Sequence, residues 1–348
     1  MVKYLTPGPV QLPPRIIEAY AKQPMFHRGK EFSELYSDVI NQLGRIFRGY
    51  TVSVLPGTGT FAVDVMVYNF IKPGDEVIVP INGEFGERLA QSVESRGAVV
   101  KRIYTEPGES ICDHVEELNV KAKAIAMIHN ETSMGVANRC ISEVAKVIHD
   151  NGGILLIDSV SGVPAEPLNN DADVIATATH KALLAPPGGS IIAFKDPGLI
   201  VSYPKPPSMD LGNYLKYSAR LETPYTPPIN VLYALRESLR YILDEVGLEK
   251  YVAIHDEKIR LLYDELNDVG FKPVPVNPND RSRTVTAFYS PVNPAKVIDY
   301  LRQNGYVISG GMWRIRERSI RIGVMGDVTL DDLRKVATLL KTLTANQP

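Results

Sequence analysis

The sequence has little of what marks several classes of protein. Two cysteines, Cys112 and Cys140, occur in 348 residues, which makes no disulfide framework and is typical of a reducing compartment. No apolar run approaches the roughly 18–20 residues of a bilayer-crossing helix, and the first residues lack the apolar core of a secretory signal. The formal net charge is −2, so bulk electrostatics indicate no nucleic-acid partner. We therefore expect a soluble, cytoplasmic protein that binds neither membranes nor nucleic acid.

Several catalytic motifs are also missing. His27, His129 and His180 are not spaced as metal ligands, and neither Glu-x-x-His nor His-Glu-x-x-His occurs. There is no Gly-x-Ser-x-Gly turn, which would present a serine nucleophile. No Lys-Ser or Lys-Thr follows the glycine-rich turn at 57–60, which excludes a Walker loop. The sequence therefore predicts no metal site.

The hydrophobic pattern predicts an α/β fold. Short apolar runs alternate with helical patterns between about residues 50 and 195, which indicates a mainly parallel sheet with helices on both faces. After about residue 247 the pattern changes to a compact α+β unit of roughly 100 residues, a normal domain size. Residues 202–228 show no periodicity and are expected to form a long loop. We expect an N-terminal arm at 1–15, a large domain at 16–247 and a small domain at 248–348.

Two strands carry the most informative residues. The apolar run 154–157 is followed at once by Asp158, and the run 174–177 leads to Lys181, 23 residues after the aspartate. Pyridoxal phosphate (PLP) needs a lysine for its Schiff base and a carboxylate at its pyridine nitrogen. An apolar setting would also make the amine easier to deprotonate and so more nucleophilic. Each residue alone has an ordinary explanation, but together with a phosphate-type turn they predict a PLP site.

The turn Gly57-Thr58-Gly59-Thr60 follows a strand and opens a helix. Free N–H groups at a helix start, with glycines that allow close approach, favour a bound phosphate. The same residues match a dinucleotide fingerprint, but that motif needs an acid after the next strand, where Asn82 stands instead. A plain glycine turn is the simpler alternative.

Arg321 lies on a later predicted strand. It could bind a substrate carboxylate with two hydrogen bonds, or it could pair with a surface acid.

The chain resembles the class V aminotransferases of the fold-type I PLP enzymes, closest to their alanine–glyoxylate and serine–pyruvate branch. The motifs keep family order along nearly the whole chain, and many motifs in one order are more specific than any single one. They are Thr6-Pro7-Gly8-Pro9, His27-Arg28 with Glu31-Phe32, Gly57-Thr58-Gly59-Thr60, Asn82-Gly83-Glu84-Phe85-Gly86, His129-Asn130-Glu131-Thr132-Ser133-Met134-Gly135, Asp158-Ser159-Val160, His180-Lys181-Ala182-Leu183 with Pro186-Pro187-Gly188, Tyr225-Thr226-Pro227 and Arg321-Ile322-Gly323.

The resemblance implies a role for each matching residue. Lys181 would form the Schiff base and move the substrate proton, and Asp158 would pair with the ring nitrogen. The implied contacts are Phe85 and Val160 on the two ring faces, Thr132 on the ring hydroxyl, Thr58, Gly59, Thr60 and His180 on the phosphate, Thr226 on the phosphate of a neighbouring subunit, Arg321 on the substrate carboxylate, and Gly8 and Pro9 beside the substrate side chain. Because Thr226 would act across subunits, the resemblance implies a homodimer.

Two residues depart from the family pattern. His180 stands where many relatives carry glutamine, and Phe85 stands where the animal alanine–glyoxylate enzymes carry tryptophan. Both replacements keep the implied contact, since histidine can donate to phosphate and phenylalanine can stack, but histidine adds pH dependence.

The function expected from these features is a ping-pong aminotransferase. A small amino acid, alanine or serine, would give its amino group to glyoxylate or pyruvate. Aspartate with 2-oxoglutarate is the first alternative and would need a second cation, for which Arg28, Arg314, Arg316 and Arg318 are candidates. A PLP lyase of the cysteine desulfurase type would need a mobile catalytic cysteine, but Cys112 and Cys140 lie far from the segment just before the Arg321 strand, which holds no cysteine. A nicotinamide-dependent dehydrogenase rests only on the glycine turn.

Overall fold

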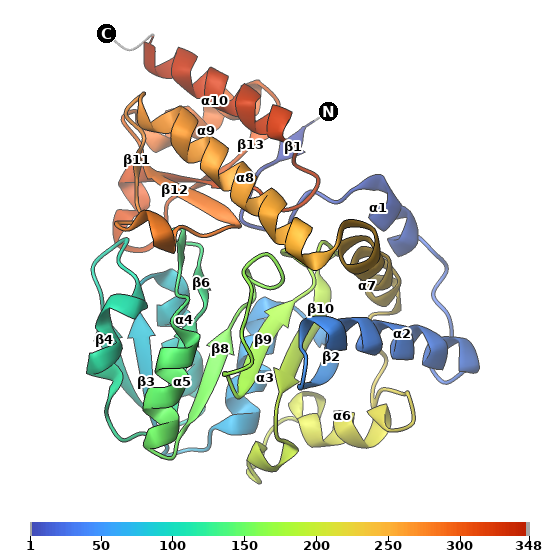
Figure 1. The fold of residues 1–348 in the computed structure, drawn as a ribbon. Helices are drawn as coiled ribbons and strands as arrows, with labels where there is room; N and C mark the ends of the chain where they lie inside the picture. Colours follow the sequence, from blue (N-terminus) through green and yellow to red (C-terminus); the bar gives the residue numbers. More distant parts are fainter. Residues whose placement is uncertain (1, 346–348) are drawn as a thin grey trace.

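A seven-stranded sheet forms the centre of the molecule, with helices on both faces and a smaller sheet beside it (Figure 1). The computed structural model describes residues 2–345. The strand order of the large sheet is β2-β10-β9-β8-β5-β3-β4. Its strands are β2 (Thr51–Gly57), β3 (Glu76–Ile81), β4 (Val99–Tyr104), β5 (Ala124–Ile128), β8 (Ile154–Asp158), β9 (Val174–Ala178) and β10 (Gly188–Phe194).

The sheet is mainly parallel, as predicted. β4, β3, β5, β8 and β9 run parallel to one another, whereas β10 is antiparallel to both of its neighbours, β9 and β2. Parallel strands need a crossover between them. Helices supply most of these crossovers, whereas residues 159–173 between β8 and β9 form turns without a helix. The carboxyl ends of β8 and β9 therefore meet at one edge of the sheet, where ligands bind in open α/β sheets.

Alternate residues of the central strands face opposite layers of helices. Ile125, Leu155 and Ile157 belong to the core beneath one helix layer, while Ala126 and Leu156 belong to the core beneath the other. The first layer consists of α2 (Lys30–Ile46), α5 (Ile141–Asp150) and α7 (Ile229–Arg240). The second consists of α3 (Gly59–Phe70), α4 (Glu84–Ser95) and α6 (Leu211–Ser218). Burial on both faces explains why these strands are almost wholly apolar.

A second sheet has a core of its own. Its order is β11-β12-β15-β14, and the strands are β11 (Lys272–Pro273), β12 (Val285–Tyr289), β14 (Ser309–Gly310) and β15 (Ser319–Gly323). The helices α8 (Leu248–Asn267), α9 (Pro294–Gln303) and α10 (Leu330–Ala345) supply apolar residues to this core. Two short hairpin strands, β6 (Asn130–Glu131) and β7 (Val136–Ala137), lie near it.

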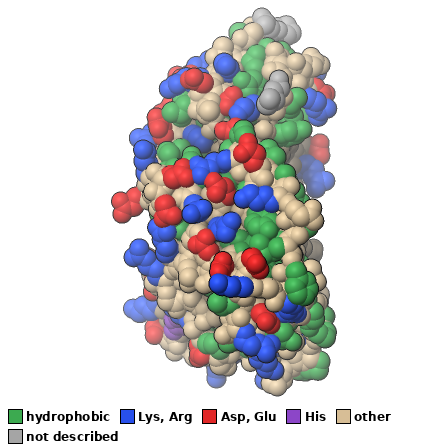
Figure 2. Space-filling view, turned by 90° about the vertical axis from the view of Figure 1, so that its right-hand side faces the viewer, with side chains coloured by type: hydrophobic (Ala, Val, Ile, Leu, Met, Phe, Trp, Pro, Cys, Tyr) green, Lys and Arg blue, Asp and Glu red, His purple; other side chains and the backbone are tan. Residues whose placement is uncertain are grey.

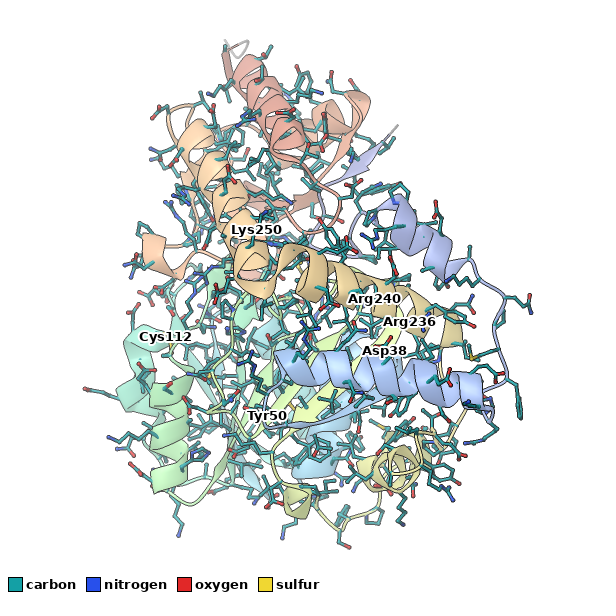
Figure 3. All side chains as sticks on the ribbon, turned by 45° about the vertical axis from the view of Figure 1, so that its right-hand side comes forward. Asp38, Tyr50, Cys112, Arg236, Arg240 and Lys250 are labelled. Atoms are coloured by element: carbon teal, nitrogen blue, oxygen red, sulfur yellow. A yellow bond between two sulfur atoms is a disulfide. The ribbon has the colours of Figure 1, made fainter. Side chains whose placement is uncertain are left out.

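The N-terminal arm is fixed to this smaller unit. β1 (Lys3–Tyr4) pairs in parallel with β13 (Tyr306–Val307), and the amide of Gly323 donates to the carbonyl of Leu5. Helix α1 (Pro14–Tyr20) then packs against α7. On the same side of the molecule, Asp38 of α2 and Arg236 of α7 lie near each other (Figure 3), with 3.9 Å between their charged atoms.

The loop predicted at 202–228 contains a helix, which corrects that expectation. α6 begins after Asp210, whose carboxylate accepts from the amide of Gly212 at 3.0 Å and caps the helix. A helix of two turns shows too few apolar repeats for periodicity to detect it. Helix α7 continues into a π-helical turn over Tyr241–Val246, which ends before Gly247.

The cysteines also differ from the expectation drawn from their number. Cys112 and Cys140 form a disulfide, with their Cα atoms 5.3 Å apart. Cys112 lies in a short helix, Ile111–Leu118, and Cys140 directly precedes α5, so elements 28 residues apart are brought together. Figure 3 labels Cys112 near the periphery of the molecule. Composition cannot detect such proximity. Among the residues described, we find no helix with the length and apolarity to cross a membrane.

Candidate active site

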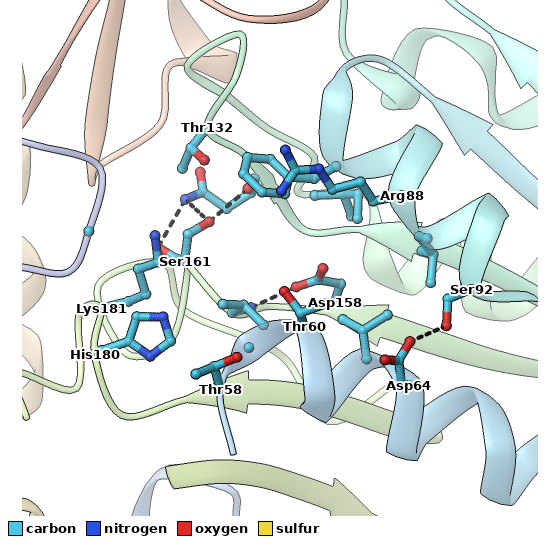
Figure 4. Close-up of a pocket in the computed structure, with 18 residues that line it drawn as sticks. Thr58, Thr60, Asp64, Arg88, Ser92, Thr132, Asp158, Ser161, His180 and Lys181 are labelled. Atoms are coloured by element: carbon cyan, nitrogen blue, oxygen red, sulfur yellow. Dashed lines mark hydrogen bonds between the residues drawn. The ribbon is translucent and has the colours of Figure 1, made fainter. Parts of the chain in front are cut away.

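A cavity opens where β8, β9 and the β2–α3 turn end (Figure 4), with a volume of about 290 Å³. Most of the site residues expected from the sequence line it. They are Gly8, Thr58, Gly59, Thr60, Phe85, Thr132, Asp158, Val160, His180 and Lys181. These residues come from segments spread over more than 170 positions of the chain, and the sheet edge brings them to one place.

Asp158 ends β8 and is buried. One carboxylate oxygen, Oδ1, accepts from the amide of Val160 at 2.8 Å, and within the described residues no hydrogen bond uses the other oxygen. Burial raises the pKa of Asp158 to about 6, while the positive charge of Lys181 acts in the opposite direction. A cationic partner in the cavity would therefore favour the ionised carboxylate.

Lys181 follows β9 and also lies in the cavity. Its amine donates to the carbonyl of Pro7 at 2.6 Å. Burial lowers the pKa of Lys181 to about 8, and the charge of nearby Arg321 adds to this effect. Asp158 works against the shift. The result is an amine that loses its proton more readily than a surface lysine does, as a carbonyl-attacking nucleophile requires.

The glycine-rich turn lies at one end of the cavity, where helix α3 begins. Thr58 directly precedes α3, and Gly59 opens it. A Cβ on Gly59 would lie 2.4 Å from Cγ1 of Val160, so only glycine allows this close approach. His180 faces the same end, and its buried Nδ1 has no hydrogen-bond partner in the described structure. An unpartnered nitrogen beside a helix start is what a phosphate would satisfy.

Arg321 stands next to the cavity on β15 rather than in its lining. Its Nε donates to the carbonyl of Gly310 at 2.8 Å and its Nη1 to that of Thr132 at 3.4 Å. Burial lowers the pKa of Arg321 to about 10, against the opposing charge of Glu131. The guanidinium stays protonated at neutral pH, because this pKa lies well above 7.

The structure does not bring Pro9 or Thr226 into the cavity lining. Pro9 follows Gly8 in the arm, and the carbonyl of Pro9 accepts from the hydroxyl of Thr6. Thr226 lies in a loop held by Arg28, whose Nη1 donates to the carbonyl of Thr223 at 2.6 Å.

The cavity also has lining residues that the sequence did not single out. Arg88 stands three residues after Phe85 on α4, and its guanidinium carbon lies 5.1 Å from the centre of the Phe85 ring. Asp64 and Ser92 hydrogen-bond each other at 2.7 Å between α3 and α4. Helical spacing from Phe85 could have indicated Arg88. The sequence could not have indicated Asp64 and Ser92, because they meet only where α3 packs against α4.

Comparison with known proteins agrees with this geometry. Residues 5–332 match the family model described as aminotransferase class-V. An uncharacterized aminotransferase of Methanocaldococcus jannaschii is 32% identical over 92% of this chain and 87% of its own length. The alanine–glyoxylate aminotransferase of Mus musculus is 30% identical over 97% of this chain and 86% of its own. The crystal structure of a subgroup IV aspartate aminotransferase from Thermus thermophilus superposes with a TM-score of 0.90 at 28% identity, covering 99% of both chains.

The fold and the site define a PLP-dependent transaminase of fold type I. More narrowly, the chain belongs to the class V aminotransferase family. The cavity fits the cofactor, because it combines a lysine of lowered pKa, a buried carboxylate and an unpartnered histidine nitrogen beside a helix start. When bound, PLP supplies an electron-accepting ring for amino-group transfer.

The pKa of Lys181 predicts how cofactor loading depends on pH. With a pKa of about 8, about one tenth of the amines are neutral at pH 7, far more than for an ordinary lysine. Because only the neutral amine attacks the aldehyde, loading of cofactor-free protein should accelerate from pH 6 to about 8 and then level off. Stopped-flow absorbance measures this rate.

The control is the same pH series with free lysine whose α-amino group is blocked in place of the protein. Comparing the two series separates the titration of Lys181 from that of PLP itself. If the rate of cofactor loading by the protein kept rising to pH 10, in parallel with that control, the result would contradict the lowered pKa of Lys181.

Proposed function

We propose that this protein transfers the amino group of a small amino acid, alanine or serine, to glyoxylate or pyruvate in a ping-pong cycle. In this proposal Lys181 bonds the cofactor and then moves the substrate proton, Asp158 holds the ring nitrogen and Arg321 holds the substrate carboxylate. Phe85, Val160 and Thr132 would hold the ring, and Thr58, Gly59, Thr60 and His180 the phosphate. The alanine–glyoxylate activity in the name of the mouse relative supports this choice.

The position of the N-terminal arm is the observation that carries the substrate class. A Cβ on Gly8 would lie 2.5 Å from Cδ of Lys181 and 2.6 Å from its Nζ, so the arm packs directly against the amine. The arm is in turn held by β13 and β15. Little room is left beside Lys181 for a large substrate side chain.

None of the arginines considered for a second carboxylate lines the cavity. Arg28 pairs with Glu222, and Arg314 lies over the rings of Tyr104 and Trp313. Arg316 and Arg318 likewise do not line the cavity, and Arg318 lies over Tyr289. These placements favour a monocarboxylic donor over aspartate.

The other enzyme classes fit less well. Aspartate aminotransferase stays the second candidate, supported by the name of the Thermus thermophilus structure. A cysteine desulfurase needs a free, mobile cysteine near the cofactor, whereas Cys112 and Cys140 are bonded to each other and lie outside the cavity lining. Membership of the aminotransferase family excludes the nicotinamide-dependent dehydrogenase.

A panel of single amino acids tests the proposal. We expect the visible absorption of the PLP-loaded protein to change on adding alanine or serine, because the amino group is transferred to the cofactor, and to return on adding glyoxylate or pyruvate. Specificity constants for aspartate and glutamate should be lower by about 10²-fold, because none of the four arginines considered for a second carboxylate lines the cavity. Faster conversion by aspartate than by alanine would refute the substrate assignment.

The proposal includes a homodimer with shared sites. Thr226 does not line the cavity of its own chain, which is consistent with a contact to the phosphate of a partner. Figure 2 looks onto the side where α1 lies and shows hydrophobic side chains gathered among charged ones. Exposed apolar residues of α1, the following loop and the Thr226 loop are Ile17, Tyr20, Phe26, Leu221 and Tyr225. Sedimentation of the purified protein tests the dimer.

Two further proposals concern organisation and location. We place the boundary between the large and small domains at 247–248, where Gly247 ends the π-helical turn and α8 begins. A separate hydrophobic core beyond this point supports the division. We also place the protein in the cytoplasm, although the pairing of Cys112 with Cys140 removes the support that the cysteines gave.

A further inference from the structure

Helix α4, which carries Phe85, begins without a capping side chain of its own. Its first flanking residue is Gly83, which has no side chain to accept from the free amides of the first turn. Those amides are satisfied from another part of the chain. The amides of Phe85 and Gly86 both donate to Oε2 of Glu131 at 3.1 Å, and the amide of Glu84 donates to Oγ of Ser133 at 3.0 Å.

Glu131 is buried completely and is fully engaged. Its second oxygen, Oε1, accepts from the hydroxyl of Ser133 at 2.5 Å and from the amide of Ser133 at 3.1 Å. The close fit requires glycine at 83, because a Cβ there would lie 2.4 Å from both Cδ of Glu131 and Oγ of Ser133. The chain therefore places a carboxylate at a helix start, where backbone amides and the helix dipole favour negative charge.

The contacts of Glu131 join three parts of the site. Phe85 is in the helix turn that Glu131 caps, and Thr132 follows Glu131 directly in the chain. The carbonyl of Thr132 accepts from Nη1 of Arg321. Burial raises the pKa of Glu131 to about 7, and its charge is the one that most offsets the lowered pKa of Arg321.

We propose that Glu131 is a positioning residue that clamps Phe85 and Thr132 together and keeps both in register with Arg321. Glu131 itself does not line the cavity. The part concerning the cofactor depends on the proposed function, whereas the clamp between β6 and α4 does not. Loss of the carboxylate frees two backbone amides at the start of α4, so the Phe85 ring and the Thr132 hydroxyl lose their fixed separation.

Hydrogen exchange of the cofactor-free protein tests the clamp directly. In Glu131→Ala, the Phe85 and Gly86 amides should exchange at least about 10-fold faster than in the wild type, because each loses its hydrogen bond to the Glu131 carboxyl group. In Glu131→Gln, one amide oxygen can still accept from both N–H groups, so exchange should lie between the two. Unchanged exchange in Glu131→Ala would overturn the proposal.

Glu166→Gln is the matched control. Glu166 is equally buried and is paired with Arg139 and Arg283, outside the cavity lining. It should lower the unfolding temperature without accelerating exchange at Phe85 and Gly86. Equal acceleration by the control would show general loosening and would refute the clamp. If Glu131→Ala does not fold, Glu131→Gln and Ser133→Ala carry the same test.

The PLP-loaded protein gives a second readout. Circular dichroism of the visible cofactor band depends on asymmetric contacts with the ring, so it should fall at least about twofold in Glu131→Gln and not in Glu166→Gln. The KM for the amino acid should rise by about 10-fold, more than kcat falls, because Arg321 loses its support. Unchanged dichroism and KM would overturn the role at the site. A wild-type protein with no visible band would instead refute the proposed function and leave the exchange test valid.

Discussion

Replacing Lys181 with alanine is expected to abolish transamination, with turnover lower by about 10⁴-fold or more, because one amine serves as both nucleophile and proton carrier. The amine lies in the cavity with its pKa lowered to about 8, so no exposed lysine can replace it. The visible absorption of the covalently attached cofactor should disappear, and borohydride should no longer fix the cofactor to the protein. Absorbance spectra and mass spectrometry of the reduced protein measure these effects.

Lys146→Ala is the control for this substitution. Lys146 is exposed on α5 and lies outside the cavity lining, so the variant should keep the wild-type spectrum and turnover. Full colour and full turnover in Lys181→Ala would disprove the central assignment of the site.

Replacing Asp158 with asparagine should have the second-largest effect. The amide keeps the size of the side chain but cannot balance a positive ring nitrogen. Removing one partner of a buried ion pair costs about 3–5 kcal/mol, which corresponds to turnover lower by roughly 10²-fold to several thousand-fold. The cofactor should still attach, because Lys181 is intact. Single-turnover kinetics with the preferred amino acid would separate the slowed proton transfer from binding.

Asp173→Asn provides a matched control. Asp173 also accepts from a backbone amide of the sheet, that of Leu155 at 2.7 Å, but it lies outside the cavity lining. Its replacement should affect stability more than turnover. A turnover in Asp158→Asn equal to that of Asp173→Asn would contradict pairing with the ring nitrogen.

Local sequence signals predicted the strongest elements well. Helix α5 (Ile141–Asp150) can be read from its local sequence, because its apolar repeat is followed by the glycines at 152 and 153, a helix stop signal. The strand ends that deliver Asp158 and Lys181 were equally clear, since β8 and β9 are apolar on both faces. Neighbouring parallel strands then put both residues at one edge, where Asp158 aligns with Ala176 in the strand register.

Other features depended on contacts between distant segments. The carbonyl of Pro7 and the amine of Lys181 are 174 positions apart in the chain and 2.6 Å apart in space. The disulfide between Cys112 and Cys140 and the cap that Glu131 gives to α4 are of the same kind. Periodicity describes a single element, so it holds no information on which elements meet.

The order of amino acids by itself determined the fold class, the cofactor chemistry and the pair Asp158 and Lys181, because these follow from local patterns and from motifs in a fixed order. The tertiary structure decided which groups surround that pair. The arm at Gly8 closes on Lys181, and Glu131 fixes the helix of Phe85. Both contacts arise from the burial of segments far apart in the chain, and burial also sets the shifted pKa values at the site.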